Sequence, residues 1–324
     1  MKVAILGGSG LVGRALTRSL SADGHEVLVL SRDPDRRAKD VPYPARVAKW
    51  SRDDVDGLAR AIDGFDSVVS VAGARVAPWR WTRRRKQTIT SSRVDTIKAI
   101  VDALARLPGD RRPSSLVVVS GIDAYPESPT GDDPMPFTEA SPAGDEFLSR
   151  VSKALEDEAC RAEGLGVRVA RLRQGHVLSP DADLVWFLAL PVRLFIGGRL
   201  GSGDQWLSWI HIDDTVALFR RAITDVQGVL NATSPGAVRQ IDFVRSMARH
   251  IHRPVWFPAP AWLVRLVLGE QSVLLLGSRR VAPARALELG YDFRYRTIDE
   301  AFDEVFGPHE RAAQAGSPHD RLGT

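Results

Sequence analysis

Three glycines, each three residues from the next, follow the first apolar run of the chain. Residues 2–6 lead directly into Gly7, Gly10 and Gly13, and an amphipathic helical pattern begins at residue 11. A glycine turn between a strand and a helix lets the backbone approach a pyrophosphate, and the helix N-terminus offers unpaired N–H groups to the same phosphates. The pattern therefore predicts a dinucleotide-binding turn made of Gly7, Gly8, Ser9, Gly10, Leu11, Val12 and Gly13.

Apolar runs and amphipathic segments alternate through the first half of the chain. Nearly continuous runs rich in Val, Ile and Leu, typical of buried parallel strands, occupy residues 2–6, 26–31, 67–72, 116–120 and 167–172. The segments with helical periodicity are 11–22, 54–62, 82–107 and 145–163. Strand–helix–strand alternation builds a parallel sheet with helices on both faces. We therefore predict an α/β chain with a doubly wound, NAD(P)-binding Rossmann fold.

The pattern loosens after Arg173, where loops rich in Gly and Pro appear. We expect residues 1–180 to form the nucleotide-binding domain and residues 207–233 to return to its sheet, with a strand at 207–212 and a helix at 213–223. Residues 181–206 and 234–308 are expected to form a smaller C-terminal lobe that binds the substrate. The small, polar and aperiodic residues of 309–324 predict a disordered tail.

Composition excludes several classes of protein. The single cysteine, Cys160, cannot form an internal disulfide, so the chain is not a disulfide-stapled scaffold. His250 and His252 have no cysteine or carboxylate partners at ligand spacing, so no metal site is expected. The 44 basic and 40 acidic residues nearly balance, and the one dense basic run, residues 83–86, has no interleaved aromatics. We therefore expect no nucleic-acid partner.

Hydropathy gives no sign of a membrane segment. The nearest approach to a membrane span, residues 184–196, is interrupted by Pro191 and Arg193. The N-terminal residues run into the glycine turn without the apolar stretch and cleavage site of a signal peptide. The sequence therefore predicts a cytoplasmic protein that acts on a small molecule and has no membrane partner.

The end of the second predicted strand bears on the choice of cofactor. It reads Ser31-Arg32-Asp33-Pro34. NAD enzymes of this fold place a carboxylate there for the ribose 2′-hydroxyl, whereas an arginine accommodates the 2′-phosphate of NADP. Asp33 precedes proline and fits the turn. We therefore predict that Ser31 and Arg32 bind NADP(H), with NAD(H) bound through Asp33 as the competing interpretation.

Further motifs support a family resemblance that covers residues 1 to about 306. They are Ala72-Gly73, Arg80-Trp81-Thr82, Ser92-Arg93, Arg173 with Gly175 and Val177-Leu178, Leu200-Gly201-Ser202-Gly203, Gln205-Trp206, Ser208-Trp209-Ile210-His211, Asp213-Asp214, Gly269-Glu270 and Ser278-Arg279-Arg280-Val281 with Pro283. In combination they resemble the atypical extended short-chain dehydrogenases/reductases, the NAD-dependent or sugar-nucleotide epimerase-like proteins that carry a C-terminal domain of unknown function. The resemblance implies NADP(H) binding but no particular substrate. Beyond the glycine turn, the expected cofactor residues are Ala72, Gly73, Ala74, Ser120, Arg173 and Gly175.

The usual catalytic pair of such a fold is absent. Short-chain dehydrogenases place a Tyr and a Lys four residues apart on the helix after the fourth strand, where the Lys lowers the phenol pKa. No Tyr-x-x-x-Lys occurs in the chain, and Leu148 and Ser152 stand in the register that we favour. Lys153 has only Ser149 four residues earlier.

Three residues are candidates for catalysis in place of that pair. Ser120 ends the predicted fourth strand, and Tyr125 follows five residues later in a loop. Tyr125 is a candidate proton donor, with coverage of the cofactor as the alternative. His176 follows the next strand and has an intrinsic pKa suited to proton transfer, although the family usually shows an apolar residue there.

Two tryptophans and the missing pair leave the function open between two classes. Trp206 and Trp209 are expected to line a substrate cleft, with core packing as the alternative. The first class is an NADP-dependent oxidoreductase or epimerase-like enzyme acting on a small polar or carbonyl substrate. The second is a non-catalytic NADP(H)-binding regulator or sensor. The second lobe favours the enzyme, and a homodimer is one option for its assembly.

Overall fold

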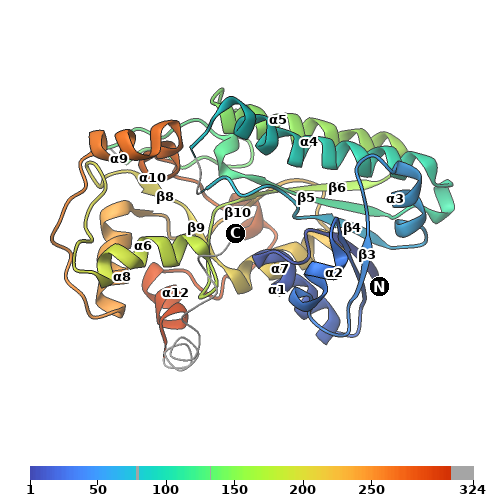
Figure 1. The fold of residues 1–324 in the computed structure, drawn as a ribbon, viewed down its shortest axis with the longest axis horizontal. Helices are drawn as coiled ribbons and strands as arrows, with labels where there is room; N and C mark the ends of the chain where they lie inside the picture. The colour runs from blue at the N-terminus through green and yellow to red at the C-terminus, as the bar shows by residue number, and fades with distance from the viewer. Residues whose placement is uncertain (78–79, 132, 308–324) are drawn as a thin grey trace.

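The computed structural model describes residues 1–77, 80–131 and 133–307, so the tail expected at 309–324 lies outside the described residues. At its centre is a parallel sheet of seven strands in the order β10-β6-β5-β4-β1-β2-β3 (Figure 1). These strands are β1 (Lys2–Leu6), β2 (Glu26–Ser31), β3 (Arg46–Lys49), β4 (Ser67–Ser70), β5 (Ser115–Gly121), β6 (Arg168–Gln174) and β10 (Gly228–Ala232). The predicted doubly wound Rossmann fold is confirmed.

The strand order reverses at β1, which pairs with β2 on one side and β4 on the other. Ile5 of β1 lies opposite Val29 and Val69 in this register, and all three side chains are buried. Both faces of the sheet are covered, so its central strands are apolar on both sides. In open α/β sheets, ligands bind outside the carboxyl ends of the strands at such a reversal.

Helices cover both faces of the sheet (Figure 1). One face carries α3 (Val55–Ile62), α4 (Arg83–Arg106) and α5 (Phe147–Cys160), and the other carries α1 (Leu11–Ala22) and α7 (Ile212–Thr224). The short elements of this part are α2 (Pro34–Arg37), η1 (Ala38–Asp40), η2 (Gly109–Arg111), η3 (Ile122–Ala124) and η4 (Arg161–Leu165). α4 buries Ile97, Ile100, Val101 and Leu104, which follow helical spacing, against α3, α5 and the sheet.

A second apolar core lies in the part of the molecule drawn at the left of Figure 1. Its elements are β7 (His176–Leu178), α6 (Asp183–Arg193), β8 (Trp206–Leu207), β9 (Trp209–His211), β11 (Val238–Arg239), α8 (Gln240–His250) and α12 (Ile298–Val305). The C-terminal part of the chain also forms α9 (Ala261–Leu268), η5 (Gly269–Ser272) and α10 (Val273–Leu276), and α11 (Ala284–Glu288), which packs on β10 of the main sheet. Phe243 on α8 and Phe302 on α12 meet edge to face at 5.0 Å in this core. No helix of the described residues is long and apolar enough to span a membrane.

One expectation about strands needs correction, and one strand was not predicted. Residues 207–212 do not enter the main sheet: β9 pairs with β7, and β8 pairs with β11, in two separate two-stranded sheets. The strand that returns to the main sheet is β10, which pairs with β6. β3 was not predicted, because this edge strand buries none of its four side chains fully and shows no continuous apolar run.

Candidate functional site

The glycine turn brings three backbone segments closer together than side chains would permit. Gly7 has a φ of 88°, and a Cβ atom on it would lie 2.7 Å from the backbone nitrogen of Ala72. A Cβ atom on Gly13 would lie 2.3 Å from the carbonyl oxygen of Gly7. Only glycine fits such approaches, so the end of β1, the start of α1 and the end of β4 meet at one point of the sheet edge.

The N-terminus of α1 is left open to a ligand. Gly10 caps the helix without a side-chain hydrogen bond, and its first turn carries no acidic residue. Gly10 is exposed, and a Cβ atom there would come no nearer to other protein atoms than 3.4 Å. A helix start with free N–H groups at the strand-order reversal suits the pyrophosphate of a dinucleotide. Ser9, Leu11 and Val12 are half-buried beside it.

At the end of β2, Arg32 and Asp33, the two candidates for the contact with the cofactor ribose, have different surroundings. Asp33 caps α2, and its Oδ1 atom accepts a hydrogen bond from the backbone N–H of Arg36 at 3.3 Å. Ser31 is buried, and its Oγ atom accepts from the backbone N–H of Asp33 at 3.2 Å. Arg32 is exposed. The carboxylate is therefore engaged in its own turn, whereas the guanidinium faces solvent.

The loop after β4 is held by two side chains of α4. The Oγ atom of Ser92 accepts a hydrogen bond from the backbone N–H of Ala74 at 3.0 Å, and Nη1 of Arg93 donates to the carbonyl oxygen of Ala74 at 3.0 Å. A Cβ atom on Gly73 would lie 3.1 Å from Cζ of Arg93, so the guanidinium packs directly on this loop. Burial lowers the pKa of Arg93, and the negative charge of Asp123 acts in the opposite direction. Ala72 thus lies against the glycine turn, and Gly73 and Ala74 continue the same loop.

Ser120 belongs to a buried ionic network that the sequence analysis did not foresee. Its hydroxyl donates to Oε1 of Glu156 on α5 at 2.7 Å. Arg173 on β6 donates to the same carboxylate with Nε at 2.9 Å and Nη2 at 2.8 Å. Burial alone lowers the pKa of Arg173, but the bidentate bond to Glu156 outweighs it and raises the pKa above the ordinary value. Glu156 lies one helical turn beyond Ser152, and this spacing is the one signal that could have pointed to it.

Arg173 and Tyr125 were expected to face a ligand, but both side chains are buried in the protein. Tyr125 has no exposed surface, and its hydroxyl donates to Oδ1 of Asn231 at 2.8 Å. Its ring stacks on Phe137, with centroids 5.4 Å apart, and the guanidinium of Arg173 lies 4.7 Å from its centre. Burial raises the pKa of Tyr125. A phenol so enclosed has no path to a substrate oxygen, so the expected proton donor is corrected to a core residue.

His176 stands between a charged pair and an apolar cavity. The cavity is lined by His176, Leu184, Leu188, Leu200, Leu207, Gln240, Phe243 and Leu275. Burial lowers the pKa of His176, Asp123 opposes this effect, and Arg279 adds to it. Nη1 of Arg279 lies 3.3 Å from Oδ1 of Asp123, whose side chain is 32% exposed while that of Arg279 is buried. Asp123 and Arg279 therefore form an ion pair next to the carboxyl end of β5, and together with His176, on which both charges act, we call them the Asp123 cluster.

The sequence analysis missed Asp123 and Arg279 as site residues. They are 156 positions apart, and no spacing rule connects them. Arg279 is fixed by a second bond, from Nε to the carbonyl oxygen of Tyr125 at 3.0 Å. It lies in the motif Ser278-Arg279-Arg280-Val281, which the resemblance had singled out without assigning it a role.

The remaining expected residues differ in their exposure. Gly175 is buried, and a Cβ atom on it would lie 2.8 Å from the carbonyl oxygen of Ser208, so it serves close backbone packing. Trp209 has no exposed surface, and its Nε1–H donates to the carbonyl oxygen of Gly236, which corrects it from a cleft residue to a core residue. Trp206 is half-buried. Its ring lies 4.0 Å from the guanidinium of Arg239 and 4.4 Å from that of Arg280.

The helix that carries the usual catalytic pair is altered here. Leu148 and Ser152 are both buried, and neither can act as a phenol or an ammonium group. Lys153 points away from the crevice: its side chain is 61% exposed, and Nζ lies 2.7 Å from Oδ2 of Asp157. No group of three or more metal-ligating side chains gathers among residues 1–77, 80–131 and 133–307.

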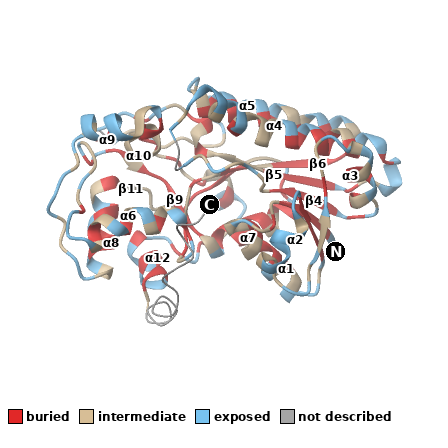
Figure 2. Ribbon diagram, in the orientation of Figure 1, coloured by how far each residue is buried: buried red, intermediate tan, exposed pale blue. Residues whose placement is uncertain are grey.

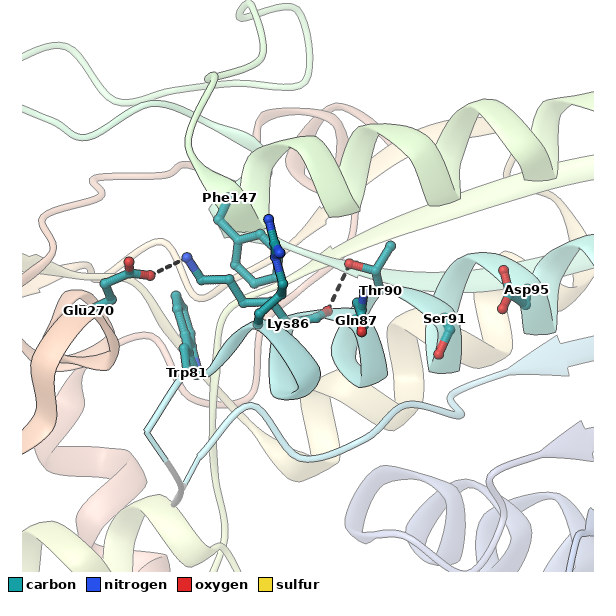
Figure 3. A pocket seen from close by; sticks show the side chains of 9 residues that line it. Trp81, Lys86, Gln87, Thr90, Ser91, Asp95, Phe147 and Glu270 are labelled. Carbon is teal, nitrogen blue, oxygen red and sulfur yellow. Dashed lines mark hydrogen bonds and ion pairs between the residues drawn. The ribbon is translucent and has the colours of Figure 1, made fainter.

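An open groove of about 690 Å³ runs along α4 beside the start of α5 (Figure 3). Figure 3 shows Lys86 extending past Phe147 toward Glu270, with which it forms an ion pair. Trp81 meets Phe147 edge to face at 5.3 Å. The residues lining this groove include none from the glycine turn or from the Asp123 cluster, so we treat it as separate from the cofactor crevice.

Fold and glycine turn together define an NAD(P)-binding protein of the Rossmann type. Comparison with known families agrees with this class and also identifies the family. Residues 3–233 match the family described as the NAD dependent epimerase/dehydratase family, and residues 259–305 match a domain of unknown function, DUF1731. The chain belongs to the NAD dependent epimerase/dehydratase family, so the resemblance stated from the sequence is confirmed.

Individual relatives are similar over almost the whole chain. The chloroplastic epimerase family protein SDR39U1 homolog of Arabidopsis thaliana is 34% identical over 314 residues, which are 94% of this chain and 86% of that protein. The epimerase family protein YfhF of Bacillus subtilis is 31% identical over 311 residues, covering 94% and 98% of the two chains. The crystal structure of human SDR39U1 with NADPH superposes with a TM-score of 0.83 at 30% identity, covering 95% of this chain and all of that one.

Proposed function

We propose that the chain is an NADP(H)-dependent oxidoreductase or epimerase-like enzyme that acts on a small polar or carbonyl substrate without a Tyr-x-x-x-Lys pair. The observation that carries this proposal is the cluster of Asp123, His176 and Arg279 beyond the carboxyl end of β5. A protein that only bound the nucleotide would have no need for a partly exposed carboxylate held by a buried arginine. Such an arrangement provides groups for proton transfer where the usual phenol is missing.

In this proposal, one group of residues holds the cofactor and another transfers a proton. Residues 7–13 and the N-terminus of α1 would hold the pyrophosphate, Arg32 the 2′-phosphate, and Ala72 to Ala74 the ribose and nicotinamide side of the crevice. When bound, the dinucleotide supplies hydride transfer. Asp123 would exchange a proton with a substrate oxygen, because its carboxylate is 32% exposed whereas its partner Arg279 is buried.

Arg279 and His176 would set the state of that carboxylate. Arg279 keeps Asp123 in place through its second bond to the carbonyl oxygen of Tyr125. His176 is neutral near pH 7 because burial lowers its pKa. It can therefore accept or donate a hydrogen bond without adding a charge. Ser120 would act as a positioning residue, because its hydroxyl is directed to Glu156.

The name of the human relative's crystal structure supports NADP(H) as the cofactor, since that structure was solved with NADPH. The exposed guanidinium of Arg32 and the capping role of Asp33 support the same choice. A structural neighbour from Thermus thermophilus, a UDP-glucose 4-epimerase, was solved with NAD, at 18% identity and a TM-score of 0.75. That likeness concerns the fold alone.

Asp123→Asn tests the enzyme proposal. The purified protein is screened for NADPH oxidation with a panel of small aldehydes, ketones and nucleotide sugars, and the variant is compared on the best substrate. Loss of a proton-transfer group should lower kcat by about 10²- to 10⁴-fold, while NADPH affinity measured by calorimetry stays unchanged. The matched control is Lys153→Ala, which should retain activity because this side chain pairs with Asp157 in solvent. Full activity of Asp123→Asn together with loss in Lys153→Ala would place the chemistry elsewhere.

One observation favours the second class of function. Leu148 and Ser152 replace the catalytic pair, and the hydroxyl of Ser120 is engaged by Glu156. A non-catalytic NADP(H)-binding regulator or sensor would bind NADPH in calorimetry yet turn over none of the panel. The same screen therefore separates the two classes.

Three broader expectations stay proposals. We propose a nucleotide-binding domain of residues 1–180 with 213–233, and a substrate lobe of residues 181–212 and 234–308, because residues 207–212 pair outside the main sheet. We propose a homodimer, which sedimentation equilibrium would test. We also propose a cytoplasmic location, although one relative carries the description chloroplastic in its name. A fluorescent fusion of the full-length protein would decide the location.

A further inference from the structure

Helix α9 turns its apolar side chains outward. In this helix of eight residues, Val264 alone is buried. Trp262 is 66% exposed and Leu266 64% exposed, and Leu263 and Val267 are exposed as well. Figure 2 shows α9 at the edge of the molecule, largely in the colour of exposed residues. A helix on the surface of a globular protein normally presents such residues to the core.

A second exposed apolar strip joins the start of this helix. The backbone N–H groups of Trp256 and Phe257 donate to the carbonyl oxygen of Gly197 at 3.1 and 3.3 Å, so residues 195–197 lie beside residues 256–257. Trp256 is 70% exposed. We define the apolar rim as the exposed residues of these segments, namely Leu194, Phe195, Ile196, Trp256, Phe257, Trp262, Leu263, Leu266 and Val267. An exposed apolar surface of this kind commonly marks an interaction site.

The charge within the segments of the apolar rim is positive. Residues 184–203 and 243–269 contain no Asp or Glu, and Asp183, Asp204, Asp242 and Glu270 stand directly at their ends. Within them, Arg199, Arg253 and Arg265 are exposed. The guanidinium of Arg253 lies 4.9 Å from the ring centre of Phe195, so positive charge stands directly among the apolar side chains. The apolar rim therefore combines aromatic and aliphatic groups with cations, and the carboxylates nearest in the sequence stand at the ends of its segments.

This chemistry matches the surface of an anionic lipid bilayer. Tryptophan and leucine side chains enter the boundary between headgroups and acyl chains, and arginines remain at the phosphates. A helix of eight residues is about 12 Å long, so α9 can lie in the interface but cannot span the bilayer. A second copy of the chain would bring arginines of like charge face to face. We propose that the apolar rim docks the protein on anionic membrane surfaces.

The proposal differs from the sequence-based expectation of no membrane partner, which rested on the absence of a spanning segment. It is also independent of the proposed enzymatic function, because it uses none of the residues of the cofactor crevice. The carbonyl groups that end α9 are already satisfied: Arg80 donates to those of Leu266 and Val267. The helix is therefore held in place without a partner.

Cosedimentation of the full chain with vesicles tests the proposal. Vesicles of phosphatidylglycerol and phosphatidylcholine should bind the protein at low salt, pure phosphatidylcholine vesicles should bind it weakly, and high salt should reduce the difference. The double substitution Trp262→Ser/Leu266→Ser should lower the partition coefficient at least about ten-fold. Arg199→Gln/Arg265→Gln should reduce binding to the anionic vesicles alone.

The matched control is Leu287→Ser on α11, a leucine 44% exposed on a helix that packs on β10. It should bind vesicles like the parent protein. All variants alter exposed side chains, so their unfolding temperatures should match that of the parent. If the unfolding temperature of the Trp262→Ser/Leu266→Ser variant is shifted, the Arg199→Gln/Arg265→Gln variant provides the test instead. Absence of binding to anionic vesicles would overturn the proposal. So would a concentration-dependent dimer, seen by sedimentation equilibrium, that the Trp262→Ser/Leu266→Ser double substitution abolishes.

Discussion

Arg32 is the residue on which the choice of cofactor depends most directly. It stands at the end of β2, exposed, next to an aspartate whose carboxylate is committed to capping α2. A guanidinium is permanently charged and has several donors, so it suits a phosphate dianion better than a ribose hydroxyl. The pyrophosphate contacts at the glycine turn are the same for either nucleotide. If the chain prefers NADP(H) as proposed, this is the position at which the two nucleotides would be distinguished.

Arg32→Ala should remove most of a preference for NADPH over NADH. A charge-assisted hydrogen bond contributes on the order of 1.5–3 kcal/mol, so we expect the parent protein to bind NADPH at least about ten-fold more tightly than NADH. Titration calorimetry of both nucleotides on both proteins measures this. The affinity for NADH should hardly change in the variant, and Arg60→Ala on α3 should behave like the parent. Equal affinities in the parent protein would return the ribose contact to Asp33.

At the same scale, residue types predicted the structure of the glycine turn better than the surroundings of the candidate catalytic residues. Gly7 and Gly13 have a role that only one residue type can fill, so their spacing alone indicates the structure. Tyr125 could be a proton donor or a core residue, and its burial against Phe137 and Asn231 decides between them. Asp123 gained its partner from a distant segment. No local pattern carries that information.

Among the elements, α5 is the helix that usually carries the catalytic Tyr and Lys, and here it carries a buried carboxylate instead. One helical turn beyond Ser152, the carboxylate of Glu156 accepts hydrogen bonds from Ser120 on β5 and Arg173 on β6. Both members of the Glu156–Arg173 pair are buried. A buried pair of this kind stabilises a fold little compared with apolar residues, but breaking it leaves an unpaired charge in the core.

A double-mutant cycle should expose this coupling. Arg173→Met leaves Glu156 buried without its counter-charge and should lower the free energy of unfolding by about 3–5 kcal/mol. Glu156→Leu/Arg173→Met should be much more stable than the sum of the two single substitutions predicts, because no isolated charge remains. Denaturant titration followed by circular dichroism gives the free energies. The exposed pair Lys153–Asp157 on the same helix is the control: Lys153→Ala should leave unfolding nearly unchanged. Simple additivity at Glu156 and Arg173 would contradict the bidentate geometry.

For the whole molecule, two histidines with lowered pKa values link stability to pH. Burial lowers the pKa of His176 and that of His211, although Asp213 and Asp214 oppose the effect at His211. The unfolded chain then takes up protons near the ordinary value of about 6.5, while the folded chain does not. Stability is therefore complete above that pH and falls as the pH decreases through it.

The free energy of unfolding should accordingly decrease between about pH 6.5 and 5. In this window the carboxylates with lowered pKa values, such as Asp299 and Glu300, are still charged. His176→Gln/His211→Asn should flatten the decrease, and asparagine preserves a side-chain acceptor for the backbone N–H of Asp213. Chemical denaturation at each pH is the measurement. An unchanged slope in the double variant would mean that neither histidine is protonated on unfolding.

The sequence predicted the central strands and the first helix well and the edges poorly. β1, β2 and α1 begin and end at the expected residues, because central strands are buried on both faces and appear as continuous apolar runs. β3 lies at the sheet edge with half-buried and exposed side chains, and its pattern resembles a loop. Residues 207–212 are as apolar as a central strand, yet they serve the second core. An apolar run predicts that a segment is buried, but it does not predict which of the two cores buries the segment.

The contact between Arg279 and Asp123 joins the two stretches that match separate families, residues 3–233 and 259–305. A further link is the backbone bridge between Phe137 and Val281. The border between the two modules therefore passes through the candidate site rather than around it. A chimera that takes its C-terminal module from a relative would therefore take one half of the ion pair at the candidate site from that relative as well. Its partner aspartate would come from the other parent, so the two halves would have to match.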